Sequence, residues 1–307
     1  MNKILITEFI NNNSLQNLKK NFEVYYDEKL WDQPEELTKL IKNFDGLIVR
    51  NKTKVTKSLL DNSEKLKFVG RLGVGLDNID TKHCTNKEIH VQPATGMNAD
   101  SVVEYVASSS LSLVKKIPLF NNGTTKGEWP RTTIKSEEIY GKTLGLVGYG
   151  SIGKKVSKYC LNLGLKILAY DPYLKDQASE KNVKFVTLNE IYETSDIISL
   201  HLPLTDETKN LINRVSFSKM KQKPIIINTS RGSVVNEDDL IEAYNNNLIS
   251  GFALDVFENE PINSNLYSKI NENMNCILTP HISGVTAQSN ERVCDFIAVK
   301  TIEFFRN

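Results

Sequence analysis

The chain has little of several features that would place it in other classes of protein. Its 38 basic and 37 acidic residues leave a formal net charge of +1, whereas proteins that bind nucleic acids or membrane surfaces usually carry a basic excess. No apolar run approaches the roughly 20 residues of a membrane span. The N-terminal stretch MNKILITEF lacks the long apolar region of a signal peptide. We therefore expect a cytoplasmic protein that binds neither nucleic acid nor membranes.

Cysteine is scarce as well, with four residues in a chain of 307. None of the four belongs to a C-x-x-C pair, the spacing typical of zinc sites and of thiol–disulfide exchange. We therefore expect no metal ion, and we interpret the thiols as buried or idle groups in a reducing compartment. They are Cys84, Cys160, Cys276 and Cys294.

The most informative stretch that is present covers residues 144–171 and reads LGLVGYGSIGKKVSKYCLNLGLKILAYD. It begins with an apolar run of the length of a buried strand. The pattern G-x-G-x-x-G follows, then apolar residues at helical spacing, then a second strand over 166–170 that Asp171 closes. A strand–turn–helix–strand unit that ends in an acid is typical of dinucleotide binding, whereas the glycine spacing alone would also fit an ordinary turn.

Each part of this unit has a physical role. Gly148 permits the tight turn, Gly150 lets the backbone approach a pyrophosphate, and Gly153 lets the helix pack closely on the strand. The helix N-terminus offers free N–H groups to that pyrophosphate. Asp171 can accept hydrogen bonds from the adenosine ribose hydroxyls and would repel a 2′-phosphate, so we expect NAD rather than NADP.

Strand-like and helical segments alternate along the chain, which predicts parallel sheets with helices on both faces. The expected strands are 3–7, 23–26, 47–49, 68–70 and 89–91, then 144–147, 166–170, 196–200, 224–228, 250–254 and 276–278. The second group, about six strands, has the size of a doubly wound dinucleotide domain. Between the groups we expect a long helix over 101–116, stopped by Pro118, and an extended polar surface segment over 121–141. A last helix is expected over 288–305.

Three loops in the second half follow strand ends, where open α/β sheets bind their ligands. They contribute one arginine, one glutamate and one histidine. Taken singly, Arg231 could be a surface charge, Glu260 an ordinary turn acid, and His281 a structural histidine. In the first half, Gly73 and Gly75 flank one residue after a strand, where N–H groups can meet an anion, although this spacing alone favours a structural turn.

Together these motifs resemble the D-isomer-specific 2-hydroxyacid dehydrogenases, the family that includes phosphoglycerate dehydrogenase. The resemblance covers nearly the whole chain, with GRLGVGLDNID and NADSVVEYVA in support of four more specific motifs. Those four are VGYGSIG (147–153), NTSRG (228–232), ALDVFENEP (253–261) and TPHISG (279–284).

The resemblance implies an α/β fold of two doubly wound parallel-sheet domains. A Rossmann NAD-binding domain would cover 98–280. A discontinuous, flavodoxin-like substrate domain would combine 1–97 with 281–307. The family further implies that the substrate, a small 2-hydroxy or 2-keto acid, lies between the domains and that the protein is a homodimer.

The resemblance also implies roles for single residues. Arg231 would bind the carboxylate and keto oxygen of the substrate, His281 would be the acid/base, and Glu260 would pair with it. Expected cofactor contacts are Gly148, Gly150, Ser151, Ile152, Gly153, Asp171, Pro203, Thr229 and Asp255. Expected substrate contacts are Arg50, Arg71, Val74, Gly75 and Asn98. Ser151 departs from the family, which often has Arg or His there, so one cationic contact to the pyrophosphate is missing.

Elementary chemistry agrees with these roles. Oxidation at C2 transfers a hydride to the nicotinamide and releases a proton from the C2 oxygen. A histidine titrates near neutral pH, so it can take that proton or return it. A neighbouring carboxylate favours the imidazolium and fixes the ring, and the planar guanidinium of arginine matches a carboxylate.

Two further arginines indicate which kind of 2-hydroxy acid is the substrate. Arg50 follows the expected strand 47–49, and Arg71 follows the expected strand 68–70, so we expect both at one edge of a parallel sheet. Two more guanidinium groups there are more than the binding of one substrate carboxylate requires. This favours a second anion, as in 3-phosphoglycerate or (S)-3-sulfolactate. Solvation, or pairing with Asp45 or Asp77, is the alternative explanation of these arginines.

Three alternative functions remain open. Glyoxylate or hydroxypyruvate reduction would also fit a small uncharged arm. An NADH-sensing binding protein is a remote alternative, because no basic tail or extra module flanks the fold. Formate dehydrogenase chemistry does not need an acid/base pair, so the presence of Glu260 speaks against it.

Overall fold

The computed structural model describes residues 1–174, 180–262, 268–271 and 273–306. The chain divides into two compact units. Unit 1 comprises Met1–Asn98 and Val285–Asn307, and unit 2 comprises Ala99–Gly284. Each unit has its own parallel sheet and its own hydrophobic core.

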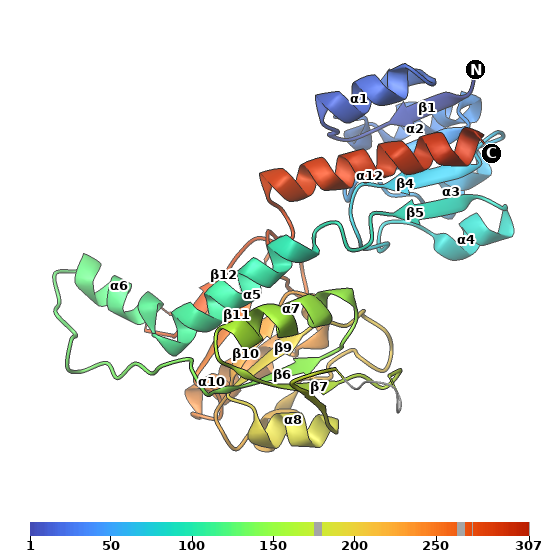
Figure 1. The fold of residues 1–307 in the computed structure, drawn as a ribbon. Coiled ribbons are helices and arrows are strands. Elements are labelled where there is room, and N and C mark those ends of the chain that lie inside the picture. The colour runs from blue at the N-terminus through green and yellow to red at the C-terminus, as the bar shows by residue number, and fades with distance from the viewer. Residues whose placement is uncertain (175–179, 263–267, 272, 307) are drawn as a thin grey trace. The chain divides into compact units, whose positions relative to one another are not determined.

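Unit 1, drawn with unit 2 in Figure 1, is built on a five-stranded parallel sheet. Its strand order, β2-β1-β3-β4-β5, is the flavodoxin-like order. Its strands are β1 (Lys3–Ile6), β2 (Glu23–Tyr26), β3 (Gly46–Val49), β4 (Phe68–Arg71) and β5 (His90–Pro93). Its helices are α1 (Asn12–Lys19), α2 (Pro34–Leu40), α3 (Lys57–Asp61), α4 (Thr81–Asn86) and α12 (Ala287–Arg306), with 3-10 turns at Leu30–Asp32 and Ile41–Asn43.

Both faces of this sheet are buried. Successive side chains of a strand point to opposite faces, so Leu5 packs in one apolar cluster while Ile4 and Ile6 pack in another. The second cluster includes side chains of α1 and α12, which lie side by side in Figure 1. Burial on both faces explains why the strands read as nearly continuous apolar runs.

Unit 2 carries a seven-stranded parallel sheet with the order β12-β11-β10-β9-β6-β7-β8. The order reverses between β6 and β9, as in doubly wound dinucleotide folds. Its strands are β6 (Thr143–Val147), β7 (Lys166–Tyr170), β8 (Val183–Phe185), β9 (Ile197–Leu200), β10 (Ile225–Asn228), β11 (Gly251–Leu254) and β12 (Cys276–Leu278). Its helices include α5 (Ala99–Val114), α6 (Ile117–Thr125), α7 (Ser151–Asn162), α8 (Leu188–Thr194), α9 (Arg214–Ser218) and α10 (Glu237–Asn245), with a 3-10 turn at Gly232–Val234.

The predicted fold class, two doubly wound parallel-sheet domains, is confirmed by these sheets, but two details differ. The sequence predicted about six strands after residue 144 and missed β8, a strand of three residues with no fully buried side chain. The expected helix, α5, ends at Val114, and a second helix, α6, begins at Ile117, so Pro118 lies inside a helix and does not end one. Lys116 adopts a left-handed backbone, and Pro118 lies in the first turn of α6, where the missing N–H is not needed. The predicted extended segment 121–141 is therefore helical up to Thr125.

All four cysteines are free thiols, three of them buried and Cys276 half-buried. Burial raises the pKa of Cys84 and Cys276 to about 11 and that of Cys160 to about 12, so these thiols stay protonated at neutral pH. Over the described ranges, none of the helices combines the length and the apolar character needed to cross a bilayer.

Candidate active site

The glycine-rich loop after β6 is shaped by close backbone contacts. A Cβ on Gly148, which has φ +93°, would lie 2.3 Å from the carbonyl oxygen of His201. A Cβ on Gly153 would lie 2.5 Å from the carbonyl oxygen of Gly148. A Cβ on Gly150 would meet nothing within 4 Å, so internal packing does not explain this glycine. Approach of a ligand to the backbone does explain it.

Helix α7 starts directly after Gly150, and its first turn has no side-chain cap among the described residues. The first N–H groups of a helix have no partner within the helix, and they carry a partial positive charge. This end of α7 is therefore suited to a phosphate.

Asp171 follows β7 and bridges two backbone segments. Its Oδ2 accepts the N–H of Tyr149 at 2.9 Å, and its Oδ1 accepts the N–H of Tyr173 at 3.0 Å. The Tyr149 ring is buried, and its hydroxyl lies 2.5 Å from Glu180 Oε2 and 2.8 Å from Ser157 Oγ. The sequence analysis did not identify Tyr149 as an anchor of this loop.

Two further groups at the same sheet edge bear on NAD. The Thr229 hydroxyl, directly after β10, is buried and has no hydrogen-bond partner in the described part of the chain. Such an orphaned group requires an explanation, and a ligand supplies one. His201, after β9, is kept neutral, because burial lowers its pKa to about 4. With the open face of Gly150 and the uncapped α7, these residues fit a dinucleotide.

The structure contains the Glu260–His281 pair that the family resemblance implies. His281 Nδ1 lies 2.8 Å from Glu260 Oε2, and Glu260 Oε1 accepts the N–H of Phe257 at 3.1 Å. Both side chains remain substantially exposed. The pair fixes the imidazole ring through Nδ1 and leaves Nε2 as the nitrogen that Glu260 does not engage.

His281 lies in an unusual backbone conformation that Asp255 supports. With φ +57°, His281 is in the left-handed region, and its N–H donates to the carbonyl oxygen of Asp255 at 2.8 Å. The fully buried Asp255 carboxylate accepts the Thr279 hydroxyl at 2.6 Å and the N–H groups of Ile282 and Ser283, each at 2.8 Å. Asp255 thus fixes the loop that carries His281, a role that the sequence analysis missed.

Arg231 belongs to a loop that is equally constrained. Its carbonyl accepts the Asn228 side-chain amide at 2.9 Å, and its Nη1 donates to the carbonyl of Ser230 at 2.6 Å. The strand ends Asn228, Leu254 and Leu278 are register partners in β10, β11 and β12. The loops of Arg231, Glu260 and His281 therefore leave one edge of the sheet from adjacent strands.

The predicted substrate contacts all lie in unit 1. Val49, which precedes Arg50, is the register partner of Arg71, so both arginines leave the same edge of this sheet. A Cβ on Gly73 would lie 1.3 Å from Nη1 of Arg71, so the guanidinium occupies the space that a side chain at position 73 would fill. Val74 and Gly75 continue this loop.

Asn98 ends the first segment of unit 1, and its Oδ1 is buried without a hydrogen-bond partner among the described residues. The pairing of Arg50 with Asp45 is not observed. Asp45 instead accepts the N–H of Lys3 at 2.7 Å, while Arg50 donates to the side chain of Asn290. The described residues hold no cluster of three or more metal-binding side chains.

Comparison with known proteins agrees with this geometry. The sequence model of the D-isomer specific 2-hydroxyacid dehydrogenase NAD-binding domain matches residues 107–283. The chain is 39% identical to a hydroxypyruvate reductase of Thermotoga maritima over 261 residues, 85% of each chain. It is 38% identical to an (S)-sulfolactate dehydrogenase of Chromohalobacter salexigens over 295 residues, 95% of each chain.

Among solved structures, the D-lactate dehydrogenase of Aquifex aeolicus in complex with NAD and lactic acid is similar over 99% of this chain and 95% of its own, with 30% identity and a TM-score of 0.87. With the dinucleotide sheet, the uncapped α7 and the motif loops in place, NAD is the cofactor and the reaction is an oxidoreduction of a CH–OH group. The chain therefore belongs to the D-isomer specific 2-hydroxyacid dehydrogenase family.

Proposed function

We propose that the protein interconverts a small 2-hydroxy acid and its 2-keto acid with His281 as the acid/base. The Glu260–His281 hydrogen bond at the carboxyl edge of the dinucleotide sheet carries this proposal. Bound NAD would accept or supply the hydride at C2. His281 would take up or return the proton of the C2 oxygen at Nε2, while Glu260 stabilises the imidazolium, and Arg231 would bind the substrate carboxylate.

For the cofactor, we propose that the pyrophosphate contacts the N-terminus of α7 and that Asp171 accepts the ribose hydroxyls. Asp171 has acceptor capacity for this, because each of its oxygens holds one backbone N–H. The other proposed cofactor contacts are Gly148, Gly150, Ser151, Ile152, Gly153, Pro203, Thr229 and Asp255.

For the substrate, we propose that a second anionic group binds Arg50 and Arg71, while Val74, Gly75 and Asn98 contact the carboxylate end. The candidates are 3-phosphoglycerate and (S)-3-sulfolactate. The two acids have the same arrangement in space, because sulfur changes the naming priority and not the geometry. The similarity to an (S)-sulfolactate dehydrogenase along 95% of the chain supports this class.

Hydroxypyruvate or glyoxylate reduction is the second candidate, favoured by the 39% identity to a hydroxypyruvate reductase. The deciding measurement is kcat/KM for sulfopyruvate, phosphohydroxypyruvate, hydroxypyruvate and glyoxylate, followed as NADH consumption. We expect the two substrates with a second anionic group to be preferred, with the preference lost in Arg50→Ala and kept in the control Lys29→Ala. If the two acids without a second anionic group are preferred and Arg50→Ala affects all four equally, the second-anion proposal is excluded.

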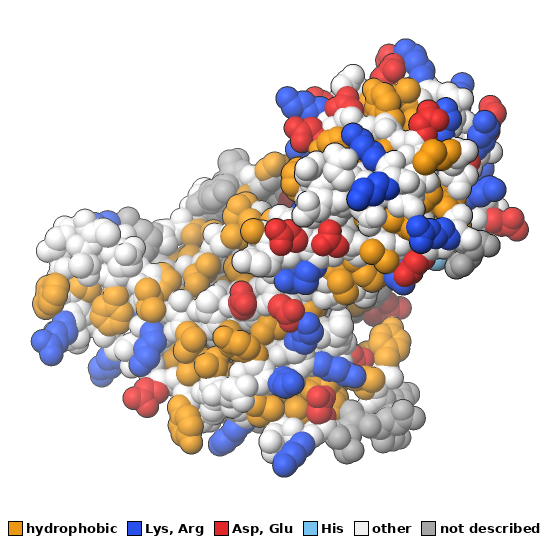
Figure 2. Space-filling model, turned by 45° about the horizontal axis from the view of Figure 1, so that its top comes forward, with side chains coloured by type: hydrophobic (Ala, Val, Ile, Leu, Met, Phe, Trp, Pro, Cys, Tyr) orange, Lys and Arg blue, Asp and Glu red, His pale blue; other side chains and the backbone are white. Residues whose placement is uncertain are grey.

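We further propose a homodimer that forms through α5 and the segment from α6 to residue 141. Its large apolar side chains are unusually exposed: Ile117 is 53% exposed, and Trp129 and Tyr140 are each 79% exposed. Figure 2 shows hydrophobic side chains on the drawn face of the molecule, among basic and acidic ones. Exposed apolar patches of this kind mark association surfaces. A monomer in light scattering at micromolar concentration would exclude the dimer.

A further inference from the structure

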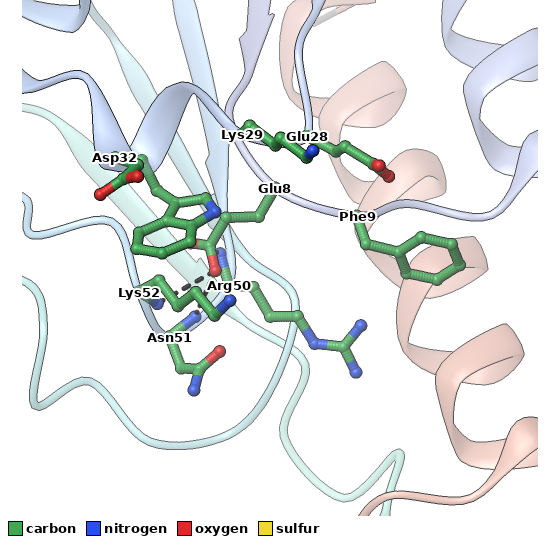
Figure 3. A pocket seen from close by; sticks show the side chains of 9 residues that line it. Glu8, Phe9, Glu28, Lys29, Asp32, Arg50, Asn51 and Lys52 are labelled. Atoms are coloured by element: carbon green, nitrogen blue, oxygen red, sulfur yellow. Dashed lines mark hydrogen bonds between the residues drawn. The ribbon is translucent and has the colours of Figure 1, made fainter.

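The loop after β3 is wrapped around a buried carboxylate. Glu8, which is 3% exposed, accepts hydrogen bonds from four consecutive backbone N–H groups, and Figure 3 draws it with the first three of these residues. The donor distances are 2.8 Å for Arg50, 3.2 Å for Asn51, 3.0 Å for Lys52 and 2.9 Å for Thr53. Consecutive backbone N–H groups form an anion-binding concavity, which here is filled by a side chain of the protein itself. Since a carboxylate offers about four acceptor positions, that of Glu8 is saturated.

The carbonyl side of the same loop is held by Asn78. Its Nδ2 donates to the carbonyl oxygen of Arg50 at 3.2 Å and to that of Thr53 at 2.7 Å. The hydroxyls of Thr53 and Thr7 lie 2.7 Å apart. Because Glu8, Asn78 and Thr53 are all buried, water does not compete for these bonds. The backbone from which the Arg50 side chain extends is therefore fixed.

The guanidinium of Arg50 has a neutral partner. Its Nη2 donates to Oδ1 of Asn290 on α12, and its Cζ lies 6.0 Å from the centre of the Phe9 ring. Throughout the described part of unit 1, no carboxylate forms an ion pair with Arg50. The Glu8 carboxylate lies at the backbone N–H of Arg50, but its acceptor positions are occupied by backbone N–H groups. The positive charge is thus held in place without being paired.

We propose that Glu8 and Asn290 are positioning residues that set the substrate specificity of Arg50. They hold the guanidinium ready for the second anionic group of the substrate and leave its charge uncompensated. This inference rests on the proposed function. A carboxylate partner would fix Arg50 equally well, but it would compete with the substrate anion. An arginine without any partner would lose side-chain freedom on binding. A neutral amide avoids both costs.

The substitution Asn290→Asp tests the role of charge with almost no change of shape. It keeps the acceptor oxygen and adds a negative charge beside the guanidinium. We expect the ratio of kcat/KM for sulfopyruvate to that for hydroxypyruvate to fall by roughly tenfold or more, mainly through KM, since hydrogen bonds to charged groups have this scale. In Asn290→Ala, which loses the tether and keeps the charge, the ratio should fall less.

A merely structural role of Asn290 predicts the opposite order of these two variants. The aspartate preserves the hydrogen bond, so it would be the milder change if only the tether mattered. If Asn290→Asp retains the wild-type ratio, or if the alanine variant loses more selectivity than the aspartate variant, the inference is wrong.

Glu8→Gln tests the hydrogen bonds by which the Glu8 carboxylate holds the loop of residues 50–53. Glutamine replaces one acceptor oxygen by an NH2 group, which then faces backbone N–H donors instead of accepting from them. We expect selectivity for sulfopyruvate over hydroxypyruvate to fall several-fold, while kcat for hydroxypyruvate stays near the wild-type value. Glu28→Gln is the matched control, because Glu28 lines the pocket of Figure 3 together with Glu8 but is exposed and accepts its hydrogen bond from Tyr26. Equal effects of the two variants would overturn the role of Glu8.

The proposed function and this inference fail in different ways. If the wild type shows no preference for substrates with a second anion, the second-anion proposal fails first. If the wild type has the preference and Arg50→Ala abolishes it, but Asn290→Asp and Glu8→Gln leave it intact, only the present inference fails. Because hydroxypyruvate shares the reacting end of sulfopyruvate, it separates loss of selectivity from loss of folding in every variant.

Discussion

In both units, a buried carboxylate holds the loop of a residue that we propose to act on the substrate. In unit 2, Asp255 at the end of β11 binds the loop after the neighbouring strand β12 and so fixes His281. In unit 1, Glu8 shortly after β1 binds the loop after the neighbouring strand β3 and so fixes Arg50. Parallel strands bring their carboxyl ends to one edge, so an acid at one strand end can reach the free N–H groups of the next loop.

Asp171 repeats the arrangement with less protein contact. It follows β7 and accepts one N–H from the glycine-rich loop after the neighbouring strand β6. Within the described residues, two hydrogen bonds end on the Asp171 carboxylate, three on that of Asp255 and four on that of Glu8. The number of bonds within the protein decides how much acceptor capacity is left for a ligand. Asp171 therefore has acceptor capacity left for a ligand, whereas Glu8 acts only through the loop that it holds.

The largest expected effect comes from removing the histidine that Asp255 fixes. His281→Ala should lower kcat by roughly 10²–10⁴ for every substrate, the usual scale for loss of an acid/base, while NAD still binds. Arg50→Ala, the corresponding change in unit 1, should act mainly on KM and only for substrates with a second anion. Steady-state kinetics with sulfopyruvate and hydroxypyruvate compare the two variants directly. Unchanged turnover in His281→Ala would refute the acid/base role.

The next largest effect is expected when the Asp255 carboxylate, which holds the loop of His281 in unit 2, is replaced. Asp255→Asn exchanges an acceptor for an NH2 group that faces backbone N–H donors of residues 282 and 283, and an unsatisfied buried group costs about 1–3 kcal/mol. We expect a fall in kcat on all substrates and a lower melting temperature. A variant with normal kcat would show that the loop of His281 does not depend on this carboxylate.

The sequence was sufficient for the sheets and for the motif loops, because both depend on local pattern. The glycine spacing and the apolar runs predicted β6 and β7 to within one residue, and the helix α7 between them. Glu260 and His281, 21 residues apart, were paired only through the family resemblance, and the structure joins them at 2.8 Å.

The missed features depend on contacts between distant segments. Glu8 is separated by more than 40 residues from the N–H groups that it accepts, and Asn290 by 240 residues from Arg50. No local periodicity marks either residue. Pro118 illustrates a different limit: a proline stops one helix or starts the next, and the left-handed Lys116 that decides between the two is not visible in the sequence.

A smaller effect is expected for Asp171, the carboxylate with the most acceptor capacity left. Asp171→Ala should narrow the preference for NADH over NADPH, because it removes both the acceptor for the ribose hydroxyls and the repulsion of a 2′-phosphate. The ratio of kcat/KM for the two cofactors measures this. Asp171→Asn is the matched variant, since it keeps one acceptor oxygen and removes the charge. If the wild type already uses both cofactors equally, the placement of Asp171 at the ribose is wrong.

The smallest expected effect is a difference between the two units in how strongly their stability depends on pH. Burial lowers the pKa of His201 in unit 2 to about 4 from an ordinary value of 6.5. Between these values the unfolded chain binds a proton that the folded unit does not, so stability falls as the pH drops from about 6.5 to about 4. The loss is at most about 3 kcal/mol, and less if water reaches the half-buried ring. In unit 1, the hydrogen bond from His83 lowers the pKa of Asp61, an exposed group whose protonation matters only below its ordinary value of 3.8.

Hydrogen exchange, corrected for the intrinsic effect of pH, resolves this difference. Between pH 7 and pH 4.5 we expect the amides of β9 and β6 to lose protection, while those of β1 and β3 keep theirs. His201→Gln, which cannot take up a proton, should remove the pH dependence from unit 2 and leave unit 1 unchanged. If wild type and variant lose protection in parallel, burial of His201 does not set the acid sensitivity of the sheet in unit 2.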